Sequence, residues 1–158
     1  FKVTPISPVM LLIVEFLIYV IYSVISLATI IPVAMLFWKV EVHGSWLTFI
    51  GSWSLTMIST LSIGMMVGGI AKNAKTASVI ACILYFPMLI FSGATLPFEV
   101  MPKGMQTVVQ FFPMTQGIQL MKAAFLGTPL SNVWLPVLVM LAVTIICSGV
   151  AIKCFKWE

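Results

Sequence analysis

The sequence predicts an all-α integral membrane protein, with four transmembrane helices and a re-entrant or interfacial helical hairpin between the third and the fourth. Three observations predict this fold class. Hydrophobic residues make up 61% of the 158 residues and charged residues only 8%, whereas a water-soluble domain carries roughly 25% charged residues. The mean hydropathy is +1.18. The few charges gather between long apolar runs, so residues 1–158 are expected to form a single transmembrane domain with the bilayer as its solvent.

The first two apolar runs are expected to cross the membrane at about residues 12–37 and 46–70. Each is longer than the roughly 20 residues that span a bilayer. Glu15 lies near the start of the first run, where it is either an interfacial or bundle-facing carboxylate or a residue with a substrate or proton role. Gly64 and Gly68 place bare backbone on one face of the second helix, which predicts close packing against a neighbouring helix or a moving interface.

Two further apolar runs predict the remaining spans, at about residues 77–94 and 132–152. The third run has about 18 residues, which is just sufficient to cross the hydrocarbon. A short polar loop that contains Lys72, Asn73 and Lys75 precedes it.

The interval at about residues 96–128 is expected to form the hairpin. It is too apolar for a solvated loop, and Pro97, Pro102 and Pro113 interrupt any straight membrane helix. Irregular backbone at membrane depth is tolerated only where protein or a water-filled cavity receives it, so we expect a re-entrant or interfacial pair of short helices. Apolar stripes at helical spacing are predicted on the two helices, with Met105, Val108, Val109 and Phe112 on the first and Ile118, Met121 and Phe125 on the second.

The lysines predict the orientation in the membrane. Four spans place both termini on one side, which then holds five lysines against three on the other, and lysines beside spans are retained on the cytoplasmic side. The termini are therefore expected to be cytoplasmic and the hairpin to face outward. The five are Lys2, Lys72, Lys75, Lys153 and Lys156, and the three are Lys39, Lys103 and Lys122.

The charged and reactive residues argue against several functions. All eight basic residues are lysines without a basic stripe, so nucleic acid is not an expected partner. The chain has four carboxylates and one histidine, and it lacks an HExxH pair and a GxxxxGK[ST] phosphate loop. We therefore expect no catalytic residues, no metal site and no cofactor on this chain, and any ATP hydrolysis on another chain or domain. The three cysteines are expected to be small apolar residues rather than disulfide partners or ligands.

About residues 60–126 carry a resemblance to a known family, in the hairpin and just before it. The resembling residues are Ser92-Gly93, Pro97, Met101-Pro102, Phe112-Pro113 and Lys122 in the hairpin, and Gly64, Gly68-Gly69, Lys72-Asn73 and Ala77 before it. In this order they resemble the signature stretch of type-2 ABC transporter permeases. Two positions depart from that family: Lys122 stands where it often has arginine, and Gln116 where an aromatic residue is common.

The resemblance implies the C-terminal two-thirds of a six-span permease, a fragment that begins just before the third span. It further implies an ATP-driven exporter in the cytoplasmic membrane that moves drug, antibiotic, lipid or polysaccharide-type cargo. The implied partners are ABC ATPase subunits and a second permease subunit, identical or different. Lys72, Asn73 and Lys75 would lie near the ATPase. The implied outer gate comprises Ser92, Gly93, Pro97, Glu99, Pro102, Pro113 and Lys122.

Two other functions remain open at this stage. A secondary transporter or channel would also use broken helices, and it predicts paired intramembrane charges and repeated halves. A non-transporting anchoring subunit would assemble through Gly64 and Gly68.

Overall fold

The computed structural model describes residues 8–39, 43–128 and 134–154, and every regular element within them is a helix. The all-α prediction is confirmed for this part of the chain. The elements are α1 Pro8–Trp38, α2 Trp46–Ile70, α3 Ala74–Ile90, the 3-10 helix η1 Phe98–Val100, α4 Lys103–Val109, α5 Pro113–Leu126 and α6 Trp134–Cys154.

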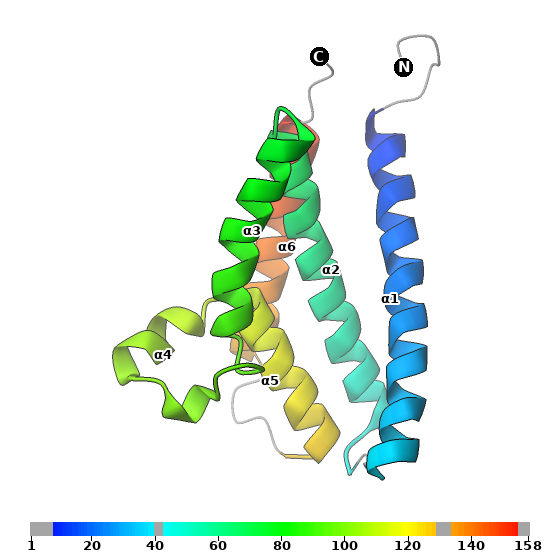
Figure 1. The fold of residues 1–158 in the computed structure, drawn as a ribbon, viewed down its shortest axis with the longest axis vertical. Coiled ribbons are helices and arrows are strands. Elements are labelled where there is room, and N and C mark those ends of the chain that lie inside the picture. The colour runs from blue at the N-terminus through cyan, green and yellow to red at the C-terminus, as the bar shows by residue number, and fades with distance from the viewer. Residues whose placement is uncertain (1–7, 40–42, 129–133, 155–158) are drawn as a thin grey trace.

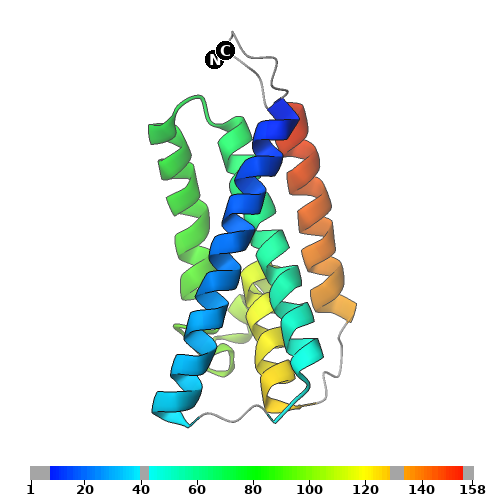
Figure 2. The same ribbon diagram turned by 90° about the vertical axis from the view of Figure 1, so that its right-hand side faces the viewer.

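The long helices run side by side and give the molecule two distinct ends (Figures 1 and 2). The beginning of α1, the connection at residues 71–73 and the end of α6 lie together at the end that we call the Lys72 end. The end of α1, the beginning of α2 and the end of α5 lie at the opposite end, the hairpin end. α4 and α5 occupy the half of the molecule away from the Lys72 end.

Three of these helices, α1, α2 and α6, are long and apolar enough to cross a membrane. α3 has 17 residues, which at 1.5 Å per residue is about 26 Å, a little short of the roughly 30 Å of hydrocarbon. α3 begins three residues before the predicted span of about 77–94 and ends four residues before its end, and the bounds of the span itself stay a prediction. The Asn73 side chain accepts a hydrogen bond from the Thr76 N–H at 2.8 Å and caps an earlier start, and the helix ends before Ser92. The four-span count stays a prediction.

α2 is the central helix, because it packs along α6 and also contacts α5, α3 and α1. Two of its three buried side chains, Ser59 and Ser62, are small and polar, and the third is Val67. Ser59 donates to the Met140 carbonyl oxygen at 3.4 Å, and the hydroxyls of Ser62 and Ser148 lie 3.3 Å apart. Polar and small residues at helix contacts are typical of membrane proteins, in which apolar side chains gain nothing by leaving the lipid.

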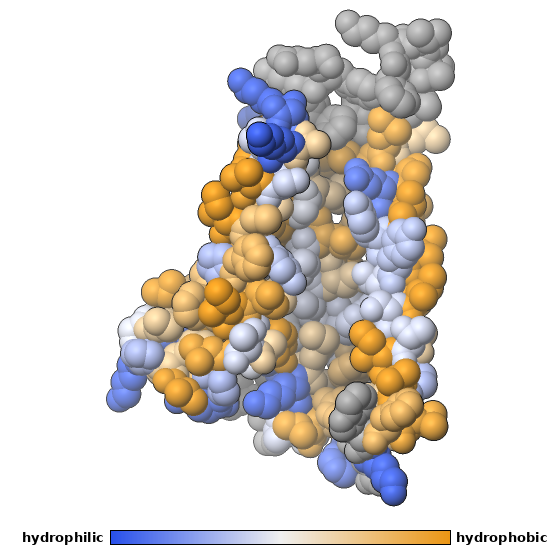
Figure 3. All heavy atoms as spheres, in the orientation of Figure 1, coloured by the Kyte–Doolittle hydropathy of each residue, from blue (hydrophilic) through white to orange (hydrophobic). Residues whose placement is uncertain are grey.

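The outer surface is correspondingly apolar. Ile83 on α3 and Ile145 on α6 are 67% and 71% exposed, and hydrophobic residues cover the outer sides of α1 and α3 (Figure 3). A surface of this kind is suited to lipid, since a soluble protein rarely exposes apolar patches of this extent.

Candidate functional site

The hairpin begins where the backbone turns out of α3. Ser92 is fully buried, and its hydroxyl donates to the Leu89 carbonyl oxygen at 2.8 Å and accepts from the Ala94 N–H at 3.2 Å. Gly93 follows at φ +89°, a backbone conformation that glycine adopts without a Cβ clash. The two residues that the resemblance singled out therefore terminate α3 and set the direction of the hairpin.

The segment that follows is held together by one glutamine. Pro97 and Pro102 stand directly before η1 and α4, where the missing N–H of proline costs no helical hydrogen bond. The Gln106 amide donates to the carbonyl oxygens of Phe98 at 3.0 Å and Met101 at 2.9 Å. Gln106 thus ties α4 back to η1. This role was missed from the sequence, where Gln106 shows only as a polar residue in an apolar interval.

The beginning of α5 is anchored by two buried polar side chains. Pro113 is its first residue. Thr115 donates to the Phe91 carbonyl oxygen at 3.4 Å, joining α5 to the end of α3, and the amide of Gln116 donates to the carbonyl oxygen of Gln110 after α4. A buried polar group needs such a partner. Gln116 therefore ties the beginning of α5 to the residue that follows α4.

Glu99 and Lys122 are brought together on the surface of the hairpin. The Lys122 Nζ lies 3.9 Å from Glu99 Oε1, and the two side chains are 65% and 72% exposed. Solvent and salt screen such a pair, so it contributes little to stability. It does link η1 to α5 across the hairpin.

The last turn of α5 is attached to the connection between α1 and α2. The N–H groups of His43 and Gly44 both donate to the Phe125 carbonyl oxygen, at 3.1 and 3.2 Å. A Cβ on Gly44 would overlap the Ala124 carbonyl oxygen and lie 3.1 Å from the Gly127 nitrogen. We call this backbone contact the α5 latch. No residue motif in the sequence indicates it.

α5 packs on α2 through a face that the apolar stripe did not predict. A Cβ on Gly117 would overlap the side chain of Thr56, so the two helices approach closely there. The stripe residues predicted on α5, Ile118, Met121 and Phe125, are only half-buried. On α4, Met105 and Val108 are exposed and Val109 is buried. The buried residues of α5 are Pro113, Thr115, Gln116, Gly117, Leu120 and Ala124.

The second predicted group lies at the other end of the molecule. Lys72, Asn73 and Lys75 are all exposed in and beside the connection between α2 and α3. Asn73 caps α3, and neither lysine is engaged in an ion pair with another described residue. The structure thus separates this loop from the hairpin by the length of the bundle (Figure 1).

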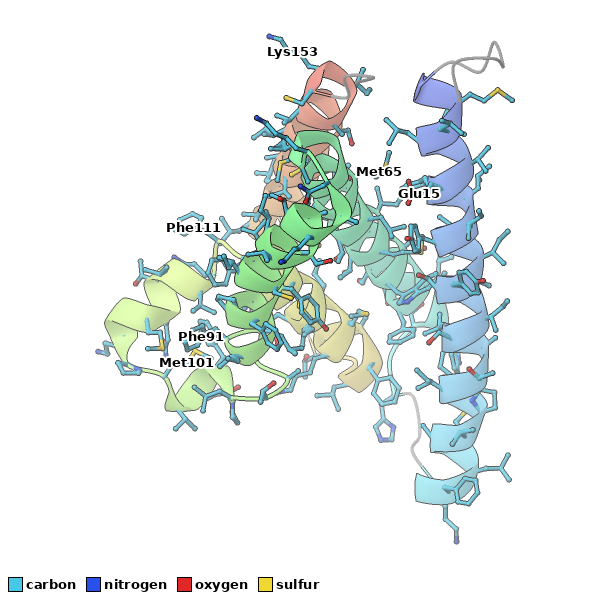
Figure 4. All side chains as sticks on the ribbon, turned by 45° about the horizontal axis from the view of Figure 1, so that its top comes forward. Glu15, Met65, Phe91, Met101, Phe111 and Lys153 are labelled. Atoms are coloured by element: carbon cyan, nitrogen blue, oxygen red, sulfur yellow. The ribbon has the colours of Figure 1, made fainter. Side chains whose placement is uncertain are left out.

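Gly64 and Gly68 do not pack against another helix within the described chain. A Cβ on either glycine would meet nothing within 4 Å, whereas one on Gly69 would lie 3.1 Å from the Ala151 carbonyl oxygen. The close approach of α2 to α6 is therefore one residue beyond the predicted pair. Gly64 and Gly68 instead line a cleft of about 520 Å³ between α1 and α2, which Glu15 also lines. Figure 4 shows Glu15 and Met65 on the facing sides of α1 and α2.

Among the described residues, no group of three or more histidine, cysteine or carboxylate side chains could hold a metal ion. Cys82, Cys147 and Cys154 are free thiols. The expectation that the chain carries no cofactor stays a prediction.

Comparison with known proteins decides the family. The sequence matches the family described as ABC-2 family transporter protein over residues 1–153. The chain belongs to this family. The resemblance seen in the hairpin is thereby confirmed, and three helices of the described part of the chain are long and apolar enough to cross a membrane.

Two curated relatives match part of the chain. Nodulation protein J of Rhizobium leguminosarum bv. viciae is 30% identical over 82 residues, which are 52% of this chain and 32% of the relative. The inner membrane transport permease YhhJ of Escherichia coli is 28% identical over 105 residues, or 66% of this chain and 28% of the relative. The matched part of the ABC-2 chain thus spans less than a third of each relative's length. No solved structure matches it.

Proposed function

We propose that the chain is part of the permease subunit of an ATP-driven ABC exporter, with ATP hydrolysis on partner ATPase subunits and a second permease subunit completing the path. Family membership carries this proposal. The name of one relative, an inner membrane transport permease, supports a place in the cytoplasmic membrane. Drug, antibiotic, lipid and polysaccharide-type molecules are the candidate cargo classes.

In this proposal the chain contributes four spans, α1, α2, α3 and α6, and the Lys72 end faces the cytoplasm. α3 completes its crossing through the turn at Ser92, because the hairpin fills the remaining depth in contact with α2. At the turn itself Ser92 is fully buried, and its hydroxyl bonds to the Leu89 carbonyl oxygen and the Ala94 N–H, so the irregular backbone there has the polar partners that the bilayer requires. The hairpin then lies at the outer end as a gate.

α2 connects the two ends mechanically. It runs unbroken from the hairpin end to the loop that contains Lys72. α5 contacts it where Gly117 meets Thr56, and the α5 latch attaches the end of α5 to the connection just before α2. A displacement of the Lys72 end by a partner ATPase would therefore tilt α2 and carry the hairpin with it.

The charges favour this function over a secondary transporter. That alternative predicts paired charges inside the membrane. In the part of the chain that the structure describes, the one ion pair joins Glu99 to Lys122, and it lies on the exposed hairpin.

Co-purification and coupling test the proposal. The full-length permease is expressed with the ATPase subunit encoded beside it, purified in detergent and placed in nanodiscs. We expect the two to co-purify and the ATPase rate to change when the permease is present. A permease that retains no ATPase, in a preparation that is monodisperse, would contradict the proposed function.

A further inference from the structure

The cleft between α1 and α2 continues along α1 as a polar groove. Its first part, about 520 Å³, is lined by Glu15, Tyr19 and Thr60 among others. A second cleft of about 400 Å³ follows and is lined by Tyr22, Ser26 and Trp53 among others. Tyr19 and Leu61 line both, so the two clefts adjoin, and we call them together the α1–α2 groove.

The polar residues of α1 share one face of an otherwise apolar helix. Glu15, Tyr19, Tyr22 and Ser26 follow one another at helical spacing of four, three and four residues. Figure 3 shows hydrophilic and near-neutral residues where α1 faces α2, and hydrophobic residues on the outer side of α1. A polar face inside a membrane helix faces protein or a cavity rather than lipid. The groove is that cavity.

Glu15 is an unpaired carboxylate in this groove. It makes no hydrogen bond or ion pair with any described residue, and no lysine or histidine lines either part of the groove. Gly64 and Gly68 lie opposite, within about two turns of the end of α2. Glu15 is exposed to the groove, seven residues after the start of α1 at the Lys72 end. In the orientation proposed above, a lone carboxylate at this position is more unfavourable the deeper it lies in the bilayer. A bound cation would offset that cost.

The remaining lining defines the chemistry of that cation. The rings of Tyr19, Tyr22 and Trp53 present apolar faces that also attract positive charge. Ser and Thr hydroxyls supply hydrogen bonds but no charge. A small inorganic cation would leave the aromatic surface unused, and an anion would be repelled by Glu15. The lining thus matches an organic cation with an apolar body.

We propose that the α1–α2 groove binds amphiphilic organic cations as cargo, with Glu15 paired to the positive charge and Tyr19, Tyr22 and Trp53 against the apolar body. This inference rests on the proposed function, since it names the cargo class of a transport permease. In the orientation proposed above, the cation enters from the cytoplasmic side.

Two probes of the same shape and opposite charge test the proposal. Binding of tetraphenylphosphonium and of tetraphenylborate to the full-length permease in nanodiscs is measured by equilibrium dialysis, with empty nanodiscs subtracted. We expect tetraphenylphosphonium to bind, and Glu15→Gln to weaken it about tenfold, which corresponds to about 1.4 kcal/mol. Glu15→Asp keeps the charge and is expected to remain within about threefold of wild type. Tyr19→Leu is expected to weaken binding about threefold through the lost ring.

The control variant is Tyr85→Leu, which removes an exposed aromatic ring on α3 that lines neither part of the groove. It is matched to Tyr19→Leu and should leave tetraphenylphosphonium affinity at the wild-type value. Each variant is first shown to be monodisperse with wild-type helical content. Equal affinity of Glu15→Gln and wild type, or equal binding of the two probes, overturns the proposal.

A second measurement tests whether a second copy of the permease fills the groove instead of the cation. Leu61→Cys, in a background with Cys82, Cys147 and Cys154 replaced by alanine, is oxidised in nanodiscs. A disulfide-linked permease dimer would show that a second copy fills the groove, and would also overturn the proposal. A complex that keeps its ATPase coupling but does not bind the cation refutes cation binding in the groove and leaves the proposed function standing. Loss of coupling refutes the proposed function instead.

Discussion

At the scale of single residues, buried polar side chains stabilise the hairpin through hydrogen bonds to helix ends. Ser92, Thr115 and Gln116 are at most 2% exposed, and each donates to a backbone carbonyl at the end of a helix. A helix end buried without such a partner leaves unsatisfied groups that lipid cannot hydrate. The polar side chains therefore permit the chain to stop and restart helices inside the bundle.

Gln116 offers a direct test of that role. Gln116→Leu keeps a similar volume but leaves the Gln110 carbonyl oxygen without its side-chain donor. We expect the variant to lose about 1 to 3 kcal/mol of stability, seen as a lower midpoint of thermal unfolding in detergent. Gln119→Leu is the matched control, because Gln119 is less buried and its replacement orphans no described carbonyl. Equal midpoints for the two variants would contradict a structural role for Gln116.

Gly44 tests the α5 latch. Gly44→Ala places a methyl group on the Ala124 carbonyl oxygen, which is backbone and cannot rotate away. We expect the hydrogen bonds from His43 and Gly44 to Phe125 to break, with faster amide exchange in the connection between α1 and α2 and a loss of about 1 to 3 kcal/mol. Gly51→Ala serves as the control, since its Cβ would meet open space and alanine favours a helix. Slow exchange retained in Gly44→Ala would show that the latch is not a constraint.

At the scale of helices, hydropathy predicted which helices exist better than it predicted which helices contact each other. Long apolar runs determined α1, α2 and α6 within a few residues, because length and composition alone decide whether a segment can cross a bilayer. The ends of α3 differ by a few residues from the predicted span, because side-chain hydrogen bonds of Asn73 and Ser92 define them and a hydropathy profile does not detect such bonds.

The apolar stripes of the hairpin were misassigned for a physical reason. Periodicity identifies the buried face of a helix in water, where apolar residues leave the solvent. In lipid the apolar residues have no reason to turn inward, and small residues mark the contact instead. Gly117, which the stripe ignored, is the point where α5 meets α2 at Thr56.

That contact predicts a compensating pair of substitutions. Gly117→Ala forces a methyl group into the Thr56 side chain, and we expect α5 to shift away from α2 with a loss of about 1 to 3 kcal/mol. Adding Thr56→Ala removes the two nearest of the three overlapping atoms and should restore part of the loss, which a double-mutant cycle of thermal unfolding would show as coupling. Independent effects of the two changes would mean that the helices do not meet there.

At the scale of the whole molecule, the sequence predicted the antiparallel order of the helices but not which helices pack against each other. An alternation of spans and polar loops dictates that Lys72 and the hairpin lie at opposite ends, as found (Figure 1). Which helices touch depends on small residues and backbone contacts, such as Gly69 on Ala151 and Gly44 on Ala124, that have no periodic signature. Two of the five lysines assigned to the cytoplasmic side, Lys2 and Lys156, lie outside the described residues.

Charge reversal at each end tests the proposed division of the molecule. Lys72 and Lys75 are exposed beside the loop between α2 and α3 and are not paired with any described residue. Reversing both to glutamate should therefore leave the fold intact but weaken an acidic contact on a partner ATPase. We expect reduced co-purification and a several-fold loss of permease-dependent ATPase activity, with the effect growing at low ionic strength because screening is weaker.

The matched change is Lys103→Glu, at the exposed start of α4 in the hairpin. In the proposed orientation this residue lies across the membrane from the ATPase, so its reversal should leave co-purification unchanged. Both variants must show wild-type unfolding midpoints, since none of these lysines contributes a described ion pair. A larger loss of ATPase from Lys103→Glu than from the Lys72 and Lys75 reversal would place the ATPase at the hairpin end. That result would invert the orientation, because the same lysines that favour a cytoplasmic Lys72 end would then face outward.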